Sequence, residues 1–401
     1  MRASLPVVVL GDPQGSRVGR HMAASYLAEV GEPYELHVLG RDDLPTGEPS
    51  WPQFAEALRR RVASPAIVFT GQEDLVELAA YLSAGWGLPH HPAGVGDRVR
   101  LKEVCRDELR KAGLPQPRSA LVDGREGLTA FVAGTDGPWI VKPRDARGST
   151  DVHFLGDVDR LGEVAALMQA YPTYVVEQFV AGPEFSVEGV FVAGRPCPVA
   201  VTQKTLFPGA GFVEMVHQQP PSLDAHLVGR LAQGAADALV ALGACTGLFH
   251  VEAWLTEGDR VVVGEVHLRS GGDWIHALTS WTRSDAPLFR LAVDDAAGRA
   301  EVPSPPRACG AGAAARFVSA EPGVATFIPD VDEIALDPSA LHVEVFVDVG
   351  DVVSPLRSSD DRVGVVVARG ESGADAAAQA ERLAARLQVE TRPTGPVPAR
   401  R

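Results

Sequence analysis

Residues 248–272, LFHVEAWLTEGDRVVVGEVHLRSGG, contain two apolar runs on either side of a polar turn at 257–260. Their β-branched and aromatic residues predict strands at 248–256 and 261–269, and the short turn predicts that the strands pair as an antiparallel hairpin. In the register that this turn sets, Glu252 lies opposite Glu265. The hairpin therefore brings two carboxylates together.

These carboxylates need a compensating charge, because directly opposed like charges destabilise a sheet and their neighbours are apolar. Mg²⁺ that holds nucleotide phosphates fits best, since it takes few protein carboxylates and keeps its other positions for phosphate and water. A solvated hairpin, in which both glutamates face water, is the alternative. Because side chains alternate between faces, the same face is predicted to carry His250, Trp254, Val263, His267 and Arg269.

The composition indicates an ordinary globular protein with more than one domain. A chain of 401 residues exceeds one ordinary core and predicts two or three domains. Its 45% hydrophobic and 6% aromatic content is typical of soluble proteins. The net charge of −15 argues against non-specific nucleic-acid binding, although a local basic pocket for phosphates is compatible with it.

The cysteines argue against a protein stabilised by disulfides or zinc, and the apolar runs argue against a membrane protein. The four cysteines lie far apart and have neither the spacing of a disulfide framework nor that of a zinc site. No window approaches the 18 apolar residues of a membrane span, so we expect no membrane partner. The apolar run at 5–10 leads directly into Gly11 and indicates a first strand rather than a signal peptide. We expect a cytoplasmic protein.

The N-terminal region alternates strands with helices, which predicts a parallel sheet with crossover helices. The predicted strands lie at 5–10, 34–40 and 65–71. Gly11, Gly15 and Gly19 are spaced four apart and do not form the G-x-G-x-x-G motif of dinucleotide sites. A Rossmann-like domain whose strand ends line a substrate cleft is the preferred interpretation.

Together with the N-terminal region, the rest of the sequence predicts an α/β chain in four parts. Asp97 is expected to cap a helix that runs to Ala112 and stops at Gly113. Short strands near 139–142, 152–155 and 174–177 follow, then longer strands, a helix at 224–242, a Pro-rich joint at 302–306 and a helix at 373–387. The predicted parts are a Rossmann-like domain (1–96), a linker helix with a small α/β subdomain (97–179), a C-terminal antiparallel-sheet domain (180–391) and a disordered tail (392–401).

Basic residues mark a candidate phosphate site. Lys142 ends an apolar strand, where an ammonium group is costly unless it meets an anion or water. The loop that follows contains Arg147, Gly148, Ser149 and a threonine, and backbone N–H groups with Arg and hydroxyl side chains can hold a phosphate. A surface loop with incidental charge is the alternative.

Other charged residues flank apolar segments. Glu177 ends a second apolar strand and Glu184 lies seven residues later. Lys102 lies beside the apolar stripe of its predicted helix, where a lysine stem that only covers apolar surface is the usual reading.

Taken together, these segments resemble the ATP-grasp superfamily in order and spacing over residues 97–275. Within it, the chain most resembles the bacterial L-amino acid ligases that make dipeptides. Glu252 and Glu265 are thirteen residues apart, with Arg269 four residues beyond the second glutamate. The segment 212–217 also resembles the Glu-x-x-His segment through which those ligases contact substrate.

The resemblance implies a fold and a set of ligand-binding residues. The fold would be ATP-grasp, with a Rossmann-like N-terminal domain, a small α/β lid and a large antiparallel sheet. ATP would be held by Lys102 and Lys142 at the phosphates, by the lid loop at Arg147, Gly148 and Ser149, by Glu177, Gln178 and Val180 at adenine, and by Glu184 at the ribose. Glu252 and Glu265 would coordinate two Mg²⁺ ions, for which Mn²⁺ is a substitute.

Catalytic and substrate roles follow from the same resemblance. Arg269 and Lys142 would stabilise the transferred phosphoryl group, and His217 is a candidate proton acceptor. Substrate would be contacted by Glu214, His217, His267, Arg269, Gly271, Gly272 and Trp274. His267 stands where many ATP-grasp enzymes have asparagine, and because imidazole is a poor ligand for Mg²⁺, we place it outside the metal shell.

The implied reaction joins a carboxylate to an amine. Transfer of the γ-phosphoryl group of ATP would give an acyl phosphate and ADP, and the amine would then displace phosphate to form an amide. Three alternatives stay open: a purine-pathway or carboxylating ligase of the same fold, a nucleotide-binding protein without activity, and a nicotinamide dehydrogenase. The partners would be small molecules, with a homodimer as the default assembly.

Overall fold

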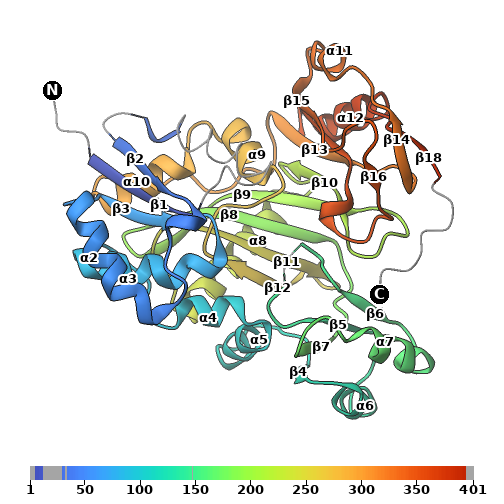
Figure 1. The fold of residues 1–401 in the computed structure, drawn as a ribbon, viewed down its shortest axis with the longest axis horizontal. Helices are drawn as coiled ribbons and strands as arrows, with labels where there is room; N and C mark the ends of the chain where they lie inside the picture. The colour runs from blue at the N-terminus through green and yellow to red at the C-terminus, as the bar shows by residue number, and fades with distance from the viewer. Residues whose placement is uncertain (1–4, 12–28, 32–33, 147, 394–401) are drawn as a thin grey trace. The chain divides into compact units, whose positions relative to one another are not determined.

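The computed structural model describes residues 5–11, 29–31, 34–146 and 148–393. The chain forms two compact units, each assembled from separate stretches of sequence (Figure 1). Unit 1 comprises Met1–Gln116, Phe185–Val201 and Leu223–Arg307. Unit 2 comprises Pro117–Glu184, Thr202–Ser222 and Ala308–Arg401.

Unit 1 begins with the predicted parallel sheet. The strands β1 (Leu5–Leu10), β2 (Tyr34–Leu39) and β3 (Ile67–Thr70) pair in the order β2-β1-β3, and both pairings are parallel. Side chains alternate between the two faces of β1, so they pack into two different cores. Val8 and Leu10 pack with residues of α2 (Trp51–Arg61) and α3 (Val76–Trp86), whereas Val7 and Val9 share a core with α10 (Leu288–Ala296). The predicted N-terminal architecture is thus confirmed for the described residues, while Gly15 and Gly19 lie outside them.

The helix predicted from Asp97 to Ala112 is two helices. Gly94, and not Asp97, caps α4 (Val95–Arg100), and α5 (Lys102–Lys111) starts after Leu101, whose backbone is extended. The break lets each short helix bury its own apolar residues, Val99 in α4 and Leu109 in α5. The predicted stop is confirmed, since Gly113 adopts a φ of 82° directly after α5.

The rest of unit 1 is built on strands that the sequence predicted. Their order is β12-β11-β8-β9, formed by β8 (Glu184–Val192), the first part of β9 (Arg195–Leu206), β11 (Leu248–Thr256) and β12 (Arg260–His267). The helix α8 (Ala225–Leu242) begins after Asp224, whose side chain accepts a hydrogen bond from the Leu227 N–H group. A short helix, α9 (Ile275–Thr282), follows the hairpin.

The predicted hairpin is present, but its register contains a bulge. Val251 pairs with Val266 and Ala253 pairs with Val263, so Glu252 faces the two residues Gly264 and Glu265. The predicted opposition of the two glutamates is therefore confirmed. The predicted position of Val263 is wrong, because the extra residue shifts the alternation and puts Val263 on the face of its partner Ala253.

Unit 2 contains the C-terminal strands and a four-stranded sheet, which we call the lid sheet after the role that the resemblance implies. The lid sheet has the order β4-β7-β5-β6, formed by β4 (Ser119–Val122), β5 (Trp139–Pro143), β6 (His153–Leu155) and β7 (Tyr174–Gln178). Its helices are α6 (Arg125–Ala133) and α7 (Leu161–Leu167), which bury Leu128 and Val164 against the sheet. All three predicted strands of this segment are confirmed.

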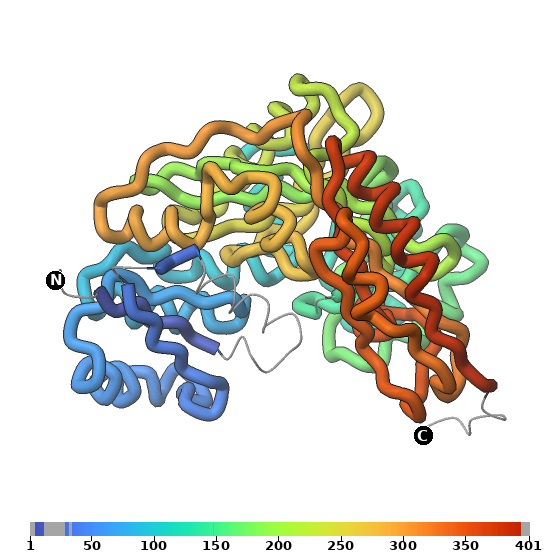
Figure 2. The backbone as a smooth tube through the Cα atoms, turned by 90° about the horizontal axis from the view of Figure 1, so that it is seen from above, coloured from blue at the N-terminus to red at the C-terminus, as the bar shows by residue number. Residues whose placement is uncertain are grey.

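The C-terminal strands continue β9 in the order β9-β10-β13-β17-β15, and their pairings are antiparallel. They are β10 (Glu214–Gln219), β13 (Gly312–Val318), β15 (Ala340–Val345) and β17 (Gly364–Gly370). The helix α12 (Gly373–Ala384) lies along these strands (Figure 2) and buries Ala376, Ala380 and Leu383. A smaller sheet and one more helix complete the unit: β14 (Gly323–Phe327), β16 (Val352–Val353), β18 (Glu390–Arg392) and α11 (Val331–Ala335).

The C-terminal tail is only partly described. Arg392, predicted as the first residue of a disordered tail, ends β18 because its backbone pairs with Val324. Residues 394–401 lie outside the described part of the chain. The division into four parts predicted from the sequence stays a prediction. Within the described ranges, none of the helices is both long enough and apolar enough to cross a membrane.

The bulge should depend on glycine at position 264. A Cβ atom there would lie 2.4 Å from Cζ3 of Trp254, closer than carbon atoms approach one another. We expect Gly264→Ala to destabilise the protein by about 1–3 kcal/mol, as overpacking does, measured by urea unfolding. In a Trp254→Leu background the same change should cost much less. Equal costs in both backgrounds would show that the ring is not the obstacle.

Candidate active site

Two groups of charged side chains stand out from the apolar strands, one in each unit. We call the group in unit 1 the hairpin cluster, and it consists of Glu73, Lys102, Glu188, His250, Glu252, Glu265, His267 and Arg269. We call the group in unit 2 the lysine cluster, and it consists of Lys142, Glu177, Glu184, Lys204 and Glu214.

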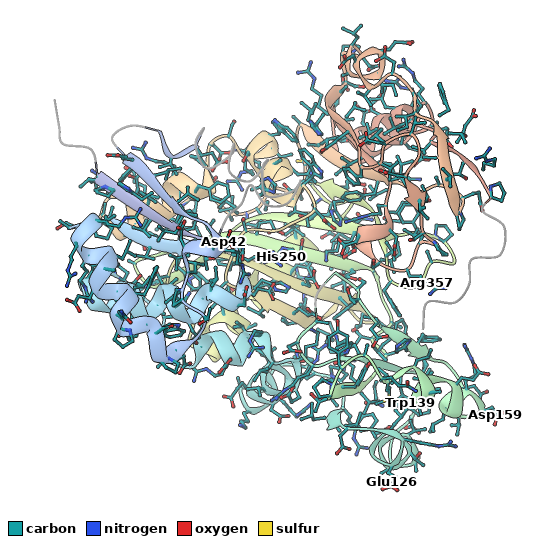
Figure 3. All side chains as sticks on the ribbon, viewed as in Figure 1. Asp42, Glu126, Trp139, Asp159, His250 and Arg357 are labelled. Carbon is teal, nitrogen blue, oxygen red and sulfur yellow. The ribbon has the colours of Figure 1, made fainter. Side chains whose placement is uncertain are left out.

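His250 lies between two carboxylates in the hairpin cluster. Its Nδ1 atom is 2.9 Å and 3.0 Å from the two carboxylate oxygens of Glu188, and its Nε2 atom is 3.3 Å from Oε1 of Glu252. Figure 3 labels His250 among the central strands of unit 1, where its side chain is 4% exposed. Burial disfavours the charged ring, but the charge and hydrogen bond of Glu188, with those of Glu252, raise the pKa of His250 to about 9. The His250 ring thus lies between the carboxylates of Glu188 and Glu252.

His267 has a similar arrangement on the neighbouring strand. Its Nδ1 atom is 2.5 Å from Oε1 of Glu73, and its Nε2 atom is 3.9 Å from Oε2 of Glu265. His250 and His267 pair across the hairpin, and their rings stack with centroids 5.3 Å apart. His267 is therefore placed beside Glu265, on the face that the sequence predicted.

Glu73 also holds Arg269. The guanidinium group donates from Nη2 and Nε to Oε1 of Glu73, at 2.7 Å and 3.1 Å, and from Nη1 to the carbonyl oxygen of Ser270. Burial would raise the pKa of Glu73, yet the charges of His267 and Arg269 and their hydrogen bonds hold it well below its usual range. Glu73 therefore fixes the side chains of both His267 and Arg269.

Lys102 completes the cluster at the start of α5. Its Nζ atom lies 3.6 Å from Oε1 of Glu265, and its side chain is 10% exposed. The predicted alternative, a lysine stem that only covers apolar surface, does not describe this contact. Each of the paired glutamates thus has a basic neighbour, His250 for Glu252 and Lys102 for Glu265.

The loop between β12 and α9 packs closely on the cluster. A Cβ atom at Gly271 would lie 2.9 Å from Oε2 of Glu188 and 2.7 Å from Cγ2 of Ile275, so only glycine fits there. Trp274 adopts a φ of 69° at the start of α9 and is 4% exposed. Gly272 accepts a hydrogen bond from the Ile275 N–H group, which closes the turn. The substrate contacts predicted for this loop stay predictions.

The lysine cluster contains a buried ion pair in the lid sheet. Nζ of Lys142 lies 2.9 Å from Oε1 of Glu177, and the two side chains are 8% and 5% exposed. The antiparallel register that pairs Ile140 with Glu177 brings the two side chains together on adjacent strands. The anion that the position of Lys142 required is, in this structure, the Glu177 carboxylate.

A second lysine joins two of the predicted site residues. Nζ of Lys204 is 2.9 Å from Oε1 of Glu184 and 3.6 Å from Oε1 of Glu214, and the Lys204 side chain is 2% exposed. A register shift between Glu214 and Val216 inserts one residue in β10. His217 pairs with Lys204 and Glu214 with Leu206, so the bulge puts Glu214 and His217 on one face, where regular alternation would separate them.

The remaining predicted residues have structural neighbours in unit 2. His217 is 1% exposed and its ring packs edge-on against Phe317. The Gln178 N–H group donates to the Arg118 carbonyl oxygen, and the Ser149 hydroxyl donates to the Phe212 carbonyl oxygen. Gly148 adopts a φ of 65° beside Ser149, and Val180 is partly exposed just after β7. Arg147 lies outside the described residues, and the ligand roles predicted for all of these stay predictions.

Four residues of the clusters were missed by sequence analysis. Glu188 and Lys204 are single charged residues inside apolar strands, the same signal that identified Lys142. His250 shares the predicted face of Glu252, so its position was predicted but its role was not. Glu73 follows β3 at a strand end, where side chains often meet ligands, and only the fold brings it to His267.

Glu252 and Glu265 suit a hard divalent cation. Both offer carboxylate oxygens, which Mg²⁺ prefers, and their side chains are 20% and 24% exposed, so an ion can reach them. The basic groups beside them show that the pair needs positive charge. The two glutamates therefore fit the predicted metal.

The buried ion pair between Lys142 and Glu177 should show the cost of a lone buried charge. We expect Glu177→Gln to destabilise the protein by about 3–5 kcal/mol, because Lys142 keeps its charge and loses the carboxylate beside it. The double variant Lys142→Met, Glu177→Gln should recover most of this loss. The measurement is the free energy of unfolding in urea. A double variant no more stable than the single one would contradict this account of the pair.

Comparison with known protein families identifies two segments of the chain. Residues 135–277 match the ATP-grasp domain, and residues 316–392 match the L-amino acid ligase C-terminal domain 2. The first segment contains Lys142, Glu177, Glu252, Glu265 and Arg269, whereas Lys102 precedes it.

Among curated relatives, the chain is similar to D-alanine--D-alanine ligases. It is 28% identical to that of Frankia casuarinae over 243 residues, which cover 53% of this chain and 61% of the relative. It is 32% identical to that of Stutzerimonas stutzeri over 108 residues, which cover 25% of this chain and 33% of the relative. The chain thus matches less than two thirds of the length of each.

Among solved structures, an L-amino acid ligase from Bacillus licheniformis has the same fold, with a TM-score of 0.76 and 18% identity over 98% of this chain and all of that one. A carboxyaminoimidazole ribonucleotide synthase from Aspergillus clavatus, solved with ATP, has a TM-score of 0.71 and 15% identity over 95% of this chain and 98% of that one. The predicted ATP-grasp fold is confirmed, and the chain contains an ATP-grasp domain together with the L-amino acid ligase C-terminal domain 2.

Proposed function

We propose that this protein joins an amino acid, or a related carboxylate, to an amine with consumption of ATP, by way of an acyl phosphate. The observation that carries the proposal is the pair Glu252 and Glu265, held on one hairpin with Lys102 and Arg269 in the same cluster. Such a set binds a divalent cation and the charged phosphoryl group that is transferred.

The C-terminal domain supports amino-acid substrates over other carboxylates. Residues 316–392 match a domain that is named for L-amino acid ligases, which favours amino acids over the purine-pathway substrates of other ATP-grasp ligases. D-Amino acids are the second candidate, favoured by the 28% identity to a D-alanine--D-alanine ligase over 243 residues.

In the hairpin cluster, the proposed work is charge neutralisation. Mg²⁺ bound by Glu252 and Glu265 would withdraw charge from the phosphate oxygens during transfer. Arg269 is oriented by Glu73 and would donate N–H groups to the phosphoryl oxygens and to the oxyanion that forms when the amine attacks. Lys102 would contact phosphate from the first turn of α5.

In the lysine cluster, the proposed work is nucleotide binding. Lys142, already paired with Glu177, would donate to ATP phosphates, and Glu177 would accept from adenine. Glu184 is fixed by Lys204 and would accept from the ribose hydroxyls. Glu214 would bind the ammonium group of a substrate, and His217, whose side chain is buried beside Phe317, is the candidate to receive its proton.

The reaction balances without a nucleophile from the enzyme. A carboxylate oxygen attacks the γ-phosphorus and the bond to the β-phosphate oxygen breaks, which gives an acyl phosphate and ADP. The amine nitrogen then attacks the acyl carbon, the acyl–oxygen bond breaks, phosphate leaves and the nitrogen loses a proton. Exclusion of water protects the acyl phosphate, which is the role we assign to the loop that contains Ser149.

The substrates can be found by measuring ADP and phosphate release from Mg-ATP with pairs of L- and D-amino acids. We expect turnover that needs two amino acids and gives ADP, with the amide detected by mass spectrometry. Preference for D-alanine pairs would select the second candidate. AMP and pyrophosphate as products would contradict the acyl-phosphate reaction.

Loss of one metal-binding carboxylate should abolish turnover without unfolding the protein. We expect Glu265→Gln to lower kcat by at least about a thousandfold, because the phosphoryl charge would lose its counter-ion. Glu257→Gln, which removes the same charge from the exposed hairpin turn, is the matched control and should retain activity. Near-normal turnover in Glu265→Gln, with circular dichroism unchanged, would refute the metal role of Glu265.

A further inference from the structure

Two histidines of the hairpin cluster share an arrangement that the proposed reaction does not use. In each, Nδ1 lies within hydrogen-bond distance of a glutamate from another segment, Glu188 for His250 and Glu73 for His267. A carboxylate oxygen accepts hydrogen bonds, so this geometry suits an Nδ1–H group that donates to the glutamate. Each ring therefore presents its Nε2 atom to the other side.

The two Nε2 atoms face the paired glutamates. Nε2 of His250 is 3.3 Å from Glu252, and Nε2 of His267 is 3.9 Å from Glu265. One ligand atom from each of His250, Glu252 and His267 lies within 4.8 Å of the other two. Ligands of one metal ion lie roughly 3–3.5 Å apart, given metal–ligand bonds of about 2.1 Å. Small side-chain rotations would close this set around an ion.

An Nδ1–H group that donates to a carboxylate is the usual support of a histidine that binds metal through Nε2. Both histidines have it, and their stacked rings already fix their relative position. Imidazole suits first-row transition metals, whereas Mg²⁺ prefers oxygen ligands. A site with these two nitrogen donors therefore suits a transition metal better than Mg²⁺.

The geometry points to a site for one first-row transition-metal ion, bound by Nε2 of His250, Nε2 of His267 and the carboxylate of Glu252, without need of nucleotide. His267 would then be a metal ligand, contrary to its placement outside the metal shell from the sequence.

This inference deepens the proposed function and rests on it for the catalytic role of the ion, since Glu252 would be shared with Mg²⁺ of the nucleotide. The binding site itself is argued from the side chains of unit 1. It can therefore be tested without turnover, and the two proposals can fail separately.

The test uses Co²⁺ as the probe, with untagged full-length protein that has been treated with chelator and contains no nucleotide. We expect one equivalent to bind in a thousandfold excess of Mg²⁺, with visible absorption bands of a low-coordinate site. X-ray absorption of the wild-type protein should show the outer-shell scattering of two imidazole rings. Co²⁺ bound with oxygen ligands alone, or not bound, would overturn the inference.

Variants assign the ligands. His267→Asn and His250→Asn should each weaken Co²⁺ binding by at least about a hundredfold, and Glu73→Gln, which frees the His267 ring, by about 10–100-fold. His342→Asn is the matched control and should bind normally, because His342 also lies two residues from a glutamate on a strand, 3.4 Å from Glu344. Full Co²⁺ affinity in His267→Asn would contradict the site.

The outcomes separate the two proposals. Imidazole-bound Co²⁺ in a protein that joins neither amino acids nor related carboxylates to an amine would leave this site in place and contradict the ligase function. Ligase activity with Mg²⁺, without nitrogen-bound Co²⁺, would support the ligase function and refute the transition-metal site. His250 is buried, so should His250→Asn fail to fold, the wild-type X-ray absorption spectrum and His267→Asn still decide the question.

Discussion

The central constraint in this structure is the opposition of Glu252 and Glu265 across a hairpin whose other residues are largely apolar. Two carboxylates on adjacent strands repel each other, and partial burial strengthens the repulsion. Basic groups lie beside both carboxylates: the imidazole of His250 contacts Glu252 and the ammonium group of Lys102 lies near Glu265, while Glu73 holds Arg269. These charged contacts join segments that are far apart in sequence, such as η4 (Glu73–Leu75) and β12. We propose that this arrangement binds a metal ion and phosphate.

Bulges decide which side chains join the sites. In β12 the extra residue at Gly264 keeps Glu265 beside Glu252 while it moves Val263 to the other face. In β10 the extra residue brings Glu214 and His217 to one face, beside Lys204. Bulges are frequent next to active sites because they redirect a side chain without ending the strand. Both clusters therefore depend on local breaks in alternation, and both breaks lie at the strands that carry the acidic residues.

Much of the fold could be predicted from the sequence, because it follows from local patterns. The strands at 5–10, 139–143 and 248–256 are apolar runs bounded by turn residues, and the structure places strands there. The break at Leu101 and the bulge at Gly264 could not be predicted, since they depend on packing between segments. Among site residues, the carboxylate pair could be predicted because one hairpin contains both glutamates. Glu73 and Glu188 were not, because only the tertiary structure brings them to His267 and His250. A lone charged residue within an apolar strand is the signal that would have found Glu188 and Lys204.

In the proposed reaction, phosphoryl transfer activates the carboxylate substrate. The most direct measurement follows ¹⁸O from a labelled amino-acid carboxylate during turnover with Mg-ATP, with the products analysed by mass spectrometry. We expect one ¹⁸O atom in inorganic phosphate for each amide formed, because the carboxylate oxygen that attacks phosphorus leaves with it. Label in AMP, or phosphate without label, would contradict the acyl phosphate and with it the role assigned to the hairpin cluster.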